Sequence, residues 1–119
     1  MTPPFSPSRD TALKRQRMSE ALQTYRLILD IDPVNANAMN SIAWMLAESG
    51  ENLDEAMVLA SKALRIRPEN PAYLDTMGCI LMRKGDTASA TRFLRRALDL
   101  QPDSEEIRSH LEEHSRGGD

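Results

Sequence analysis

Apolar residues recur along this chain at the spacing of helix faces, and prolines interrupt the pattern at regular distances. Three segments repeat the same order of residues, running from Ala21 to Pro33, from Ala56 to Pro68 and from Ala90 to Pro102. Their Ala positions are 35 and then 34 residues apart, and so are their Pro positions. A period of this length is typical of stacked helical hairpins.

Each of these segments predicts an amphipathic helix that ends before its proline, as the spacing of Ala90, Leu94 and Ala97 illustrates. Two further apolar stripes with the spacing i, i+3, i+4, i+7 lie between them, and a glycine follows each stripe. The stripes are Met39, Ile42, Ala43 and Leu46 before Gly50, and Leu74, Met77, Gly78 and Leu81 before Gly85. They predict the first helices of two hairpins, in which the small residues Ala43 and Gly78 allow close packing.

The landmarks of these hairpins resemble the signature of the tetratricopeptide repeat family. The best unit carries Leu74, Met77, Gly78, Leu81, Gly85, Ala90, Leu94, Ala97 and Pro102 at the family's spacing. The preceding unit matches from Met39 to Pro68, with Asn52 as one extra residue in its turn. The resemblance covers about residues 18 to 114 and implies an all-α solenoid of antiparallel helical hairpins. The competing interpretation is a helical bundle without repeats.

We expect about six helices in a single domain over residues 9–114. Its predicted parts are a half repeat at 9–33, repeats at 36–68 and 71–102, and a capping helix at 104–114, between a disordered Pro-rich leader at 1–8 and a flexible tail at 115–119. Ser8 is the expected N-cap of the first helix. Glu112 stands where the repeats have small residues, which favours a polar cap for the last helix.

The resemblance implies that the first helices line a concave surface that holds a peptide or helix of a protein partner. On each first helix a second stripe runs beside the core stripe, and we expect it to face this groove. The predicted groove residues are Asn40, Trp44, Ala47, Glu48, Asp75, Cys79, Met82 and Arg83. Trp44 is the predicted anchor, because an aromatic residue outside the core pattern is a common binding hot spot, and burial in the core is the alternative. Cys79 and Met82 are weaker candidates for binding, because methionine and cysteine are just as often buried in a protein core.

One subset of the family holds the C-terminal carboxylate of heat-shock chaperones with Lys, Asn and Arg from three successive first helices. This chain has Ser41, Ala72 and Thr76 where such residues would stand, which argues against that ligand. Asn37, Asn40 and Asp75 remain able to form hydrogen bonds with a peptide backbone.

Self-association is the second functional interpretation. The first helix presents Leu22, Tyr25, Ile28 and Leu29 with one neighbouring hairpin to cover them, and an apolar face of this kind favours a homodimer or a scaffold segment. Lys14, Arg15 and Arg17 near the start of that helix indicate a solvated face. The alternative for these basic residues is docking on an acidic surface.

Composition narrows the classes of function further. The chain of 119 residues has a net charge of −3, which argues against nucleic acid as a partner. Cys79 is the only cysteine, and no apolar run is long enough to span a bilayer or to form a secretory signal. We therefore expect a soluble cytoplasmic protein without a membrane partner.

Catalytic signals are weak. His110 and His114 fit an H-x-x-E-H pattern of zinc peptidases, but the sequence shows no evident third ligand for a metal ion. The sequence contains no phosphate-binding loop, no CxxC pair and no Ser/His/Asp order of a catalytic triad. The prediction is a non-enzymatic protein without a cofactor or a metal site.

Overall fold

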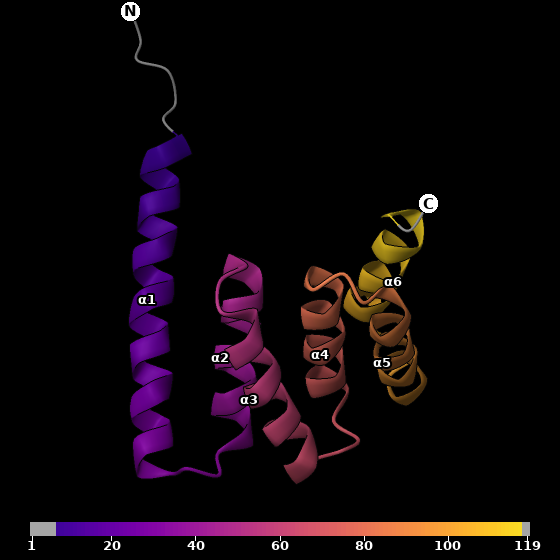
Figure 1. The fold of residues 1–119 in the computed structure, drawn as a ribbon, viewed down its shortest axis with the longest axis horizontal. Coiled ribbons are helices and arrows are strands. Elements are labelled where there is room, and N and C mark those ends of the chain that lie inside the picture. Colours follow the sequence, from indigo (N-terminus) through magenta and orange to yellow (C-terminus); the bar gives the residue numbers. More distant parts are fainter. Residues whose placement is uncertain (1–6, 118–119) are drawn as a thin grey trace, which may run out of the picture.

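The computed structural model describes residues 7–117, which form six helices and no strand. The helices are α1 (Pro7–Ile31), α2 (Ala36–Ser49), α3 (Leu53–Ile66), α4 (Pro71–Arg83), α5 (Thr87–Leu100) and α6 (Glu105–Gly117). From one end of the molecule to the other stand α1, the pair α2 and α3, then α4, and then α5 with α6 (Figure 1). The predicted all-α solenoid of about six helices is confirmed.

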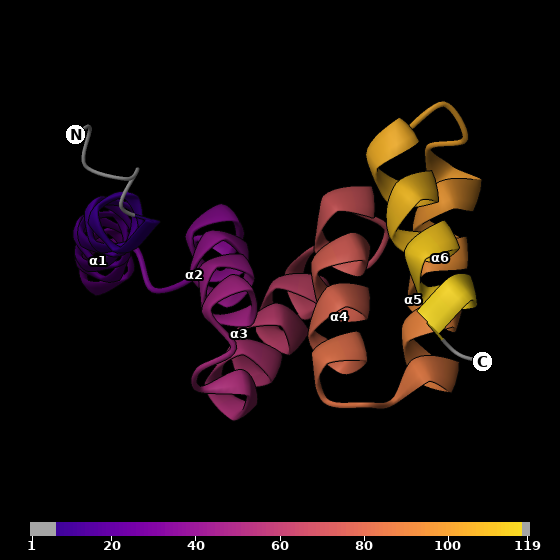
Figure 2. The ribbon, with the colours of Figure 1, turned by 90° about the horizontal axis from the view of Figure 1, so that it is seen from above.

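Two antiparallel hairpins, α2 with α3 and α4 with α5, make up the centre of the molecule (Figures 1 and 2). Small residues bring the helices of a hairpin together. A Cβ atom added to Gly78 of α4 would lie 2.7 Å from Cγ of Leu94 on α5, closer than two carbon atoms can pack. Ala43 on α2 and Ala60 on α3 are likewise fully buried. The predicted role of small residues in hairpin packing is therefore confirmed.

The core runs continuously between the hairpins and consists mainly of Ala, Leu, Ile and Met side chains. Its largest cluster contains Ile42, Ala43, Leu46, Ala47, Ala56, Ala60, Met77, Ile80, Leu81 and Ala90. A smaller cluster joins Leu74, Ala97 and Ile107, and so attaches α6 to the second hairpin. Burial of these apolar faces, rather than helix propensity, stabilises helices of this length.

Side chains and glycine fix the ends of the hairpin helices. Asn35 accepts a hydrogen bond from the backbone N–H of Ala38 at 2.9 Å and starts α2. Asn70 does the same for α4 through the N–H groups of Ala72 and Tyr73. Gly50 ends α2 in the left-handed conformation, with φ at 75°. Both first helices thus begin at an asparagine whose side chain caps their free N–H groups.

The chain ends differ from the prediction. Helix α1 already includes Pro7 and Ser8, so Ser8 is not the N-cap and the expected leader is wrong at these two positions. Proline is tolerated in the first turn of a helix because its missing N–H would have no partner there. Residues 115–117 continue α6 and do not belong to a flexible tail. Residues 1–6 and 118–119 lie outside the described part, so the structure does not address the predictions for them.

Candidate functional site

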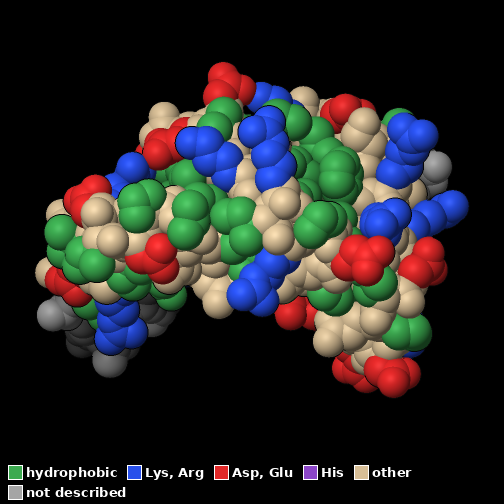
Figure 3. All heavy atoms as spheres, turned by 90° about the horizontal axis from the view of Figure 1, so that it is seen from below, with side chains coloured by type: hydrophobic (Ala, Val, Ile, Leu, Met, Phe, Trp, Pro, Cys, Tyr) green, Lys and Arg blue, Asp and Glu red, His purple; other side chains and the backbone are tan. Residues whose placement is uncertain are grey.

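The row of helices curves, and the first helices of the two hairpins line the inner side of the curve. Seen from below, the molecule is an arch whose one edge is hollowed between the α1 end and the α6 end (Figure 3). Helices α2 and α4 pack against each other, and α6 also contacts α4. Residues of these three helices line a common hollow.

A hollow of about 180 Å³ opens on this surface between α2, α4 and the start of α6. Its lining comes from all three helices and from the turn before α6: Asn40, Trp44, Ala72, Asp75, Thr76, Gln101, Ser104, Glu106 and Ile107. Gln101, Ser104 and Glu106 were not predicted as lining residues, because the last helix was expected to act only as a cap.

Trp44 is the largest side chain of the hollow, and 39% of its surface is exposed. Most other large apolar residues of α2, such as Met39 and Leu46, are buried in the core. An indole that packs on one side and meets solvent on the other offers both apolar area and an N–H donor. The alternative that Trp44 belongs to the closed core is not supported by this exposure.

Asn40 lies one turn before Trp44 on the same face of α2. Its Oδ1 atom is buried and, among the described residues, accepts no hydrogen bond. A buried amide oxygen without a donor is uncommon, because leaving it unpaired costs about 1–3 kcal/mol. The residue therefore offers an acceptor to a group that enters the hollow.

Two predicted groove residues are buried, but only one of them is withdrawn from the inner surface. Ala47 is 3% exposed and belongs to the main core cluster, because the packed face of α2 is wider than the predicted stripe. Asp75 is 6% exposed, and one of its carboxylate oxygens lies 2.8 Å from Nδ1 of His110 on α6. Ala47 is thus corrected to a core residue, whereas Asp75 lines the base of the hollow.

The carboxyl ends of α2 and α4 carry the remaining predicted groove residues. Met82 is half-buried and packs against the main cluster. Arg83 is exposed, and its guanidinium donates a hydrogen bond of 3.5 Å to the backbone oxygen of Glu48. This contact ties the two first helices together at the edge of the inner surface.

Cys79 is half-buried and lies one helical turn after Asp75 on α4. Its Sγ atom is 3.7 Å from Nδ1 of His110, the same nitrogen that approaches Asp75. Burial raises the pKa of the Cys79 thiol to about 12, and the neighbouring carboxylates act in the same direction. The thiol is therefore protonated at neutral pH and is no activated nucleophile.

The sequence shows no evident third ligand for a metal ion beside the two histidines, but in the structure two ligand-type side chains of α4 approach His110. Its ring nitrogen, the Asp75 carboxylate and the Cys79 sulfur all lie within 4.8 Å of one another. The sequence hides this cluster, because α4 and α6 are separated by the whole of α5. The side chain of His114, the other histidine of the H-x-x-E-H pattern, lies outside the described part.

The predicted self-association residues of α1 are directed inward for the most part. Leu22, Tyr25 and Leu29 pack against the main core cluster, and Ile28 is half-buried. The apolar side chains that α1 exposes are different ones, Leu27 and Ile31. The sequence pattern identified an apolar face of α1, but that face is the one that α2 covers.

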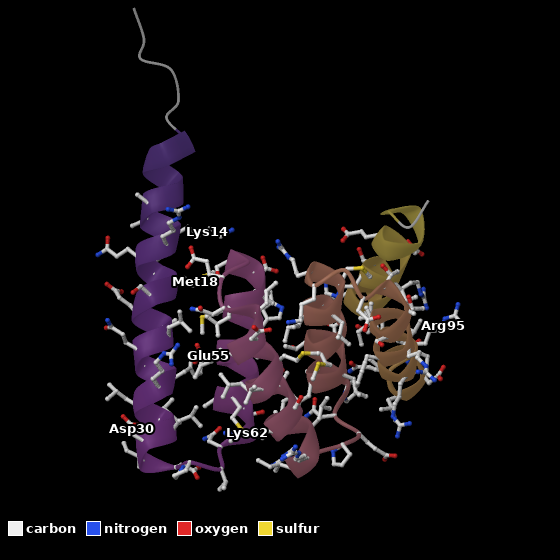
Figure 4. All side chains as sticks on the ribbon, viewed as in Figure 1. Lys14, Met18, Asp30, Glu55, Lys62 and Arg95 are labelled. Carbon is white, nitrogen blue, oxygen red and sulfur yellow. The ribbon has the colours of Figure 1, made fainter. Side chains whose placement is uncertain are left out.

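A second cleft of about 530 Å³ separates α1 from the turn between α2 and α3. Lys14 and Met18 project from α1 toward these helices (Figure 4). Glu48 and Glu51 lie on the opposite wall. Further down, Arg26 of α1 pairs with Glu55 of α3 at 3.0 Å. The basic residues Lys14 and Arg15 thus line this cleft together with acidic residues of the same chain.

Comparison with known proteins supports the repeat assignment. The family model described as "Tetratricopeptide repeat" matches residues 72–104. A curated Pseudomonas aeruginosa protein, the TPR repeat-containing protein PA4667, is 38% identical over 102 residues, which is 86% of this chain. The chain spans only 17% of the length of that relative.

Solved structures show the same architecture. A Thermobaculum terrenum O-GlcNAc transferase mutant matches with a TM-score of 0.75 and 27% identity, over 87% of this chain and 20% of its own. The first TPR of Spaghetti (RPAP3), solved with an HSP90 peptide, matches with a TM-score of 0.77 and 18% identity, over 91% and 85% of the two chains. Among residues 7–117, no helix combines the length and hydropathy of a membrane span. The repeat spacing, the hairpin solenoid and these similarities together show that the chain belongs to the tetratricopeptide repeat family.

Proposed function

We propose that this chain is a protein-interaction module that binds a peptide or helix of a partner along the inner surface formed by α2, α4 and α6. Domains of this family generally act as interaction modules rather than as catalysts. The observation that carries the proposal is the exposed Trp44 side chain beside a hollow walled by three helices. An exposed indole next to a concave surface is a typical anchor for a partner side chain.

The charges of the hollow indicate the chemistry of the partner segment. Asp75 and Glu106 line it, and Asn40 adds a buried acceptor oxygen. Such a surface favours N–H donors and basic side chains and disfavours carboxylates. We infer that the partner presents an apolar side chain to Trp44 and at least one donor or positive charge to the hollow.

A chaperone tail is a poor match for the same surface. Such a tail ends in carboxylates, and the HSP90 peptide in the Spaghetti complex, SRMEEVD, is acidic. In this chain the corresponding region offers Ala72, which is exposed, and Thr76, whose hydroxyl donates to the Ala72 carbonyl at 3.0 Å. The lining therefore supplies no positive charge for an acidic tail.

Binding of selected peptides tests the proposal. Peptides are selected from a random display library on the intact chain, and their affinities are then measured for Trp44→Ala and for Val58→Ala. Val58 is an exposed apolar residue of α3 outside the hollow and is the matched control. We expect Trp44→Ala to weaken binding by more than about 2 kcal/mol, or roughly 30-fold, while Val58→Ala leaves it unchanged.

Two outcomes would contradict the proposal. One is equal loss of affinity in both variants, which would place binding elsewhere. The other is a loss of folding stability in Trp44→Ala as large as the loss in binding, which would assign Trp44 to the core. Sedimentation at two protein concentrations addresses the alternative, self-assembly through α1, since only that alternative predicts a mass that rises with concentration.

A further inference from the structure

Three side chains with different donor atoms converge where α6 meets α4. Asp75 and Cys79 stand one turn apart on the same face of α4, and His110 faces both from α6. Nδ1 of His110 lies 2.8 Å from the Asp75 carboxylate and 3.7 Å from the Cys79 sulfur. Oxygen, nitrogen and sulfur thus surround one small volume.

These separations are close to those of ligands around a tetrahedral zinc ion. Zn–S bonds of about 2.3 Å and Zn–N or Zn–O bonds of about 2.0–2.2 Å imply ligand separations of roughly 3.6 Å for S···N and 3.4 Å for N···O. The sulfur and nitrogen of the cluster already have this spacing. The Asp75 oxygen, which lies within 4.8 Å of the sulfur, needs to move away from Nδ1 by roughly half an ångström and to settle at roughly 3.6 Å from the sulfur.

We propose that Asp75, Cys79 and His110 bind a zinc ion that joins α6 to α4. The mixture of one thiolate, one imidazole and one carboxylate favours zinc over calcium or magnesium, which prefer oxygen ligands alone. Binding releases the thiol proton of Cys79 to solvent, because the metal coordinates the thiolate. The inference rests on this cluster alone and does not depend on the proposed peptide binding.

Three protein ligands leave a fourth position open. Glu106 stands one turn before His110 on α6 but lies outside the cluster, so a water molecule completes the four ligands that are usual for zinc in proteins. An ion at this place holds the capping helix against the last hairpin, and it stabilises the folded chain by mass action.

The rival explanation is a purely structural set of hydrogen bonds, in which Asp75 and Cys79 only position His110. The two explanations differ in a property that is measured directly. A hydrogen-bonded set gives no metal spectrum and no thermal stabilisation by metal. A zinc site gives both, and it loses both when any one ligand is removed.

Cobalt binding tests the proposal, because Co²⁺ replaces zinc and reports its ligands by absorption. The untagged chain, pretreated with a chelator, is titrated with CoCl₂ under reducing conditions. Cys79 is the only cysteine of the sequence, so a thiolate-to-cobalt charge-transfer band in a monomeric 1:1 complex comes from that residue. We expect such a band, visible absorption of tetrahedral intensity, and displacement of both by ZnCl₂.

Variants decide which residues hold the ion. Cys79→Ser is expected to abolish the charge-transfer band, and His110→Gln and Asp75→Asn are expected to weaken metal binding by at least about 100-fold. His114→Gln is the matched control, since His114 is the only other histidine, and it is expected to retain the spectrum. Circular dichroism checks that each variant is folded, and zinc should raise the melting temperature of the parent chain but not of Cys79→Ser.

Three results would overturn the proposal. The first is the absence of a charge-transfer band at saturating cobalt in the folded parent chain. The second is a band that survives in His110→Gln or disappears in His114→Gln, which would assign the metal to other residues. The third is a stoichiometry of two chains per ion, which would indicate a shared cysteine between molecules.

Discussion

Close approach of two helices at single residues determines how the hairpins pack. At Gly78 the space for a side chain is occupied by Cγ and Cδ2 of Leu94, at 2.7 and 2.9 Å from a Cβ position, and by the Ala90 carbonyl oxygen at 3.3 Å. Leu94 itself is fully buried. The steric effect of a methyl group at Gly78 therefore opposes its effect on helix propensity.

Gly78→Ala separates these two effects. Alanine is favoured over glycine by about 1 kcal/mol inside a helix, so propensity alone predicts a more stable protein. Overpacking of a dense core typically destabilises by about 1–3 kcal/mol, and the contact with buried Leu94 leads us to expect a net loss of stability. Urea unfolding followed by circular dichroism measures the difference, and a stabilised variant would show that α5 moves away without strain.

At the scale of the helix, two asparagines at N-cap positions differ in what they do. Asn70 caps α4 with its side chain, which accepts hydrogen bonds from the N–H groups of Ala72 and Tyr73 at 2.9 and 3.2 Å. Asn52 precedes α3 with φ at 55° and forms no capping hydrogen bond with its side chain. The extra residue of the first hairpin turn is thus accommodated by a left-handed backbone conformation.

Substitutions of these asparagines should therefore affect the free energy of unfolding differently. Asn70→Ala removes a cap and is expected to lower the free energy of unfolding by about 1 kcal/mol. Asn52→Gly is expected to be neutral or mildly stabilising, because glycine adopts a positive φ without steric penalty. Chemical denaturation of both variants and of the parent chain measures their free energies of unfolding. Equal destabilisation would mean that the Asn52 side chain contributes a contact of its own.

The helices could be predicted well from the sequence, because periodic apolar residues, prolines and glycines are local signals. Helices α2 and α4 begin at Ala36 and Pro71, where the predicted repeats begin, and α3 and α5 end two residues before Pro68 and Pro102. The inner surface was harder to predict. Ala47 is buried because the packed face of α2 is broader than an ideal stripe, and Glu106 lines the hollow because α6 turns toward α4. The cluster of Asp75, Cys79 and His110 depends on that tertiary docking, which no local pattern encodes.

The whole molecule is an arch whose helices differ in how many neighbours they pack against. The backbone of α1 lies close only to α2, whereas α4 contacts α2, α3, α5 and α6. One exposed ion pair, Arg26 with Glu55, adds a contact between α1 and α3, and exposed pairs of this kind contribute little. Repeat proteins of this type open in parts, and segments with few neighbours open first.

Amide hydrogen exchange should show whether α1 opens before the helices at the centre of the molecule. We expect amides of α1 near residues 12–20 to exchange at least about tenfold faster than those in the middle of α4, since opening α1 exposes only one interface. Mass spectrometry of peptic fragments at several labelling times measures the rates. Uniform protection across α1 and α4 would show that the chain unfolds as one cooperative unit.

The most direct test of the account uses Trp44 as its own reporter, because it is the only tryptophan of the chain. A display-selected peptide is titrated into the intact protein while the indole emission is recorded, and its affinity is measured independently by calorimetry. If the inner surface is the binding site, the emission shifts to shorter wavelength as the indole is desolvated, and it saturates at the calorimetric dissociation constant. Tight binding with an unchanged Trp44 emission would contradict the account.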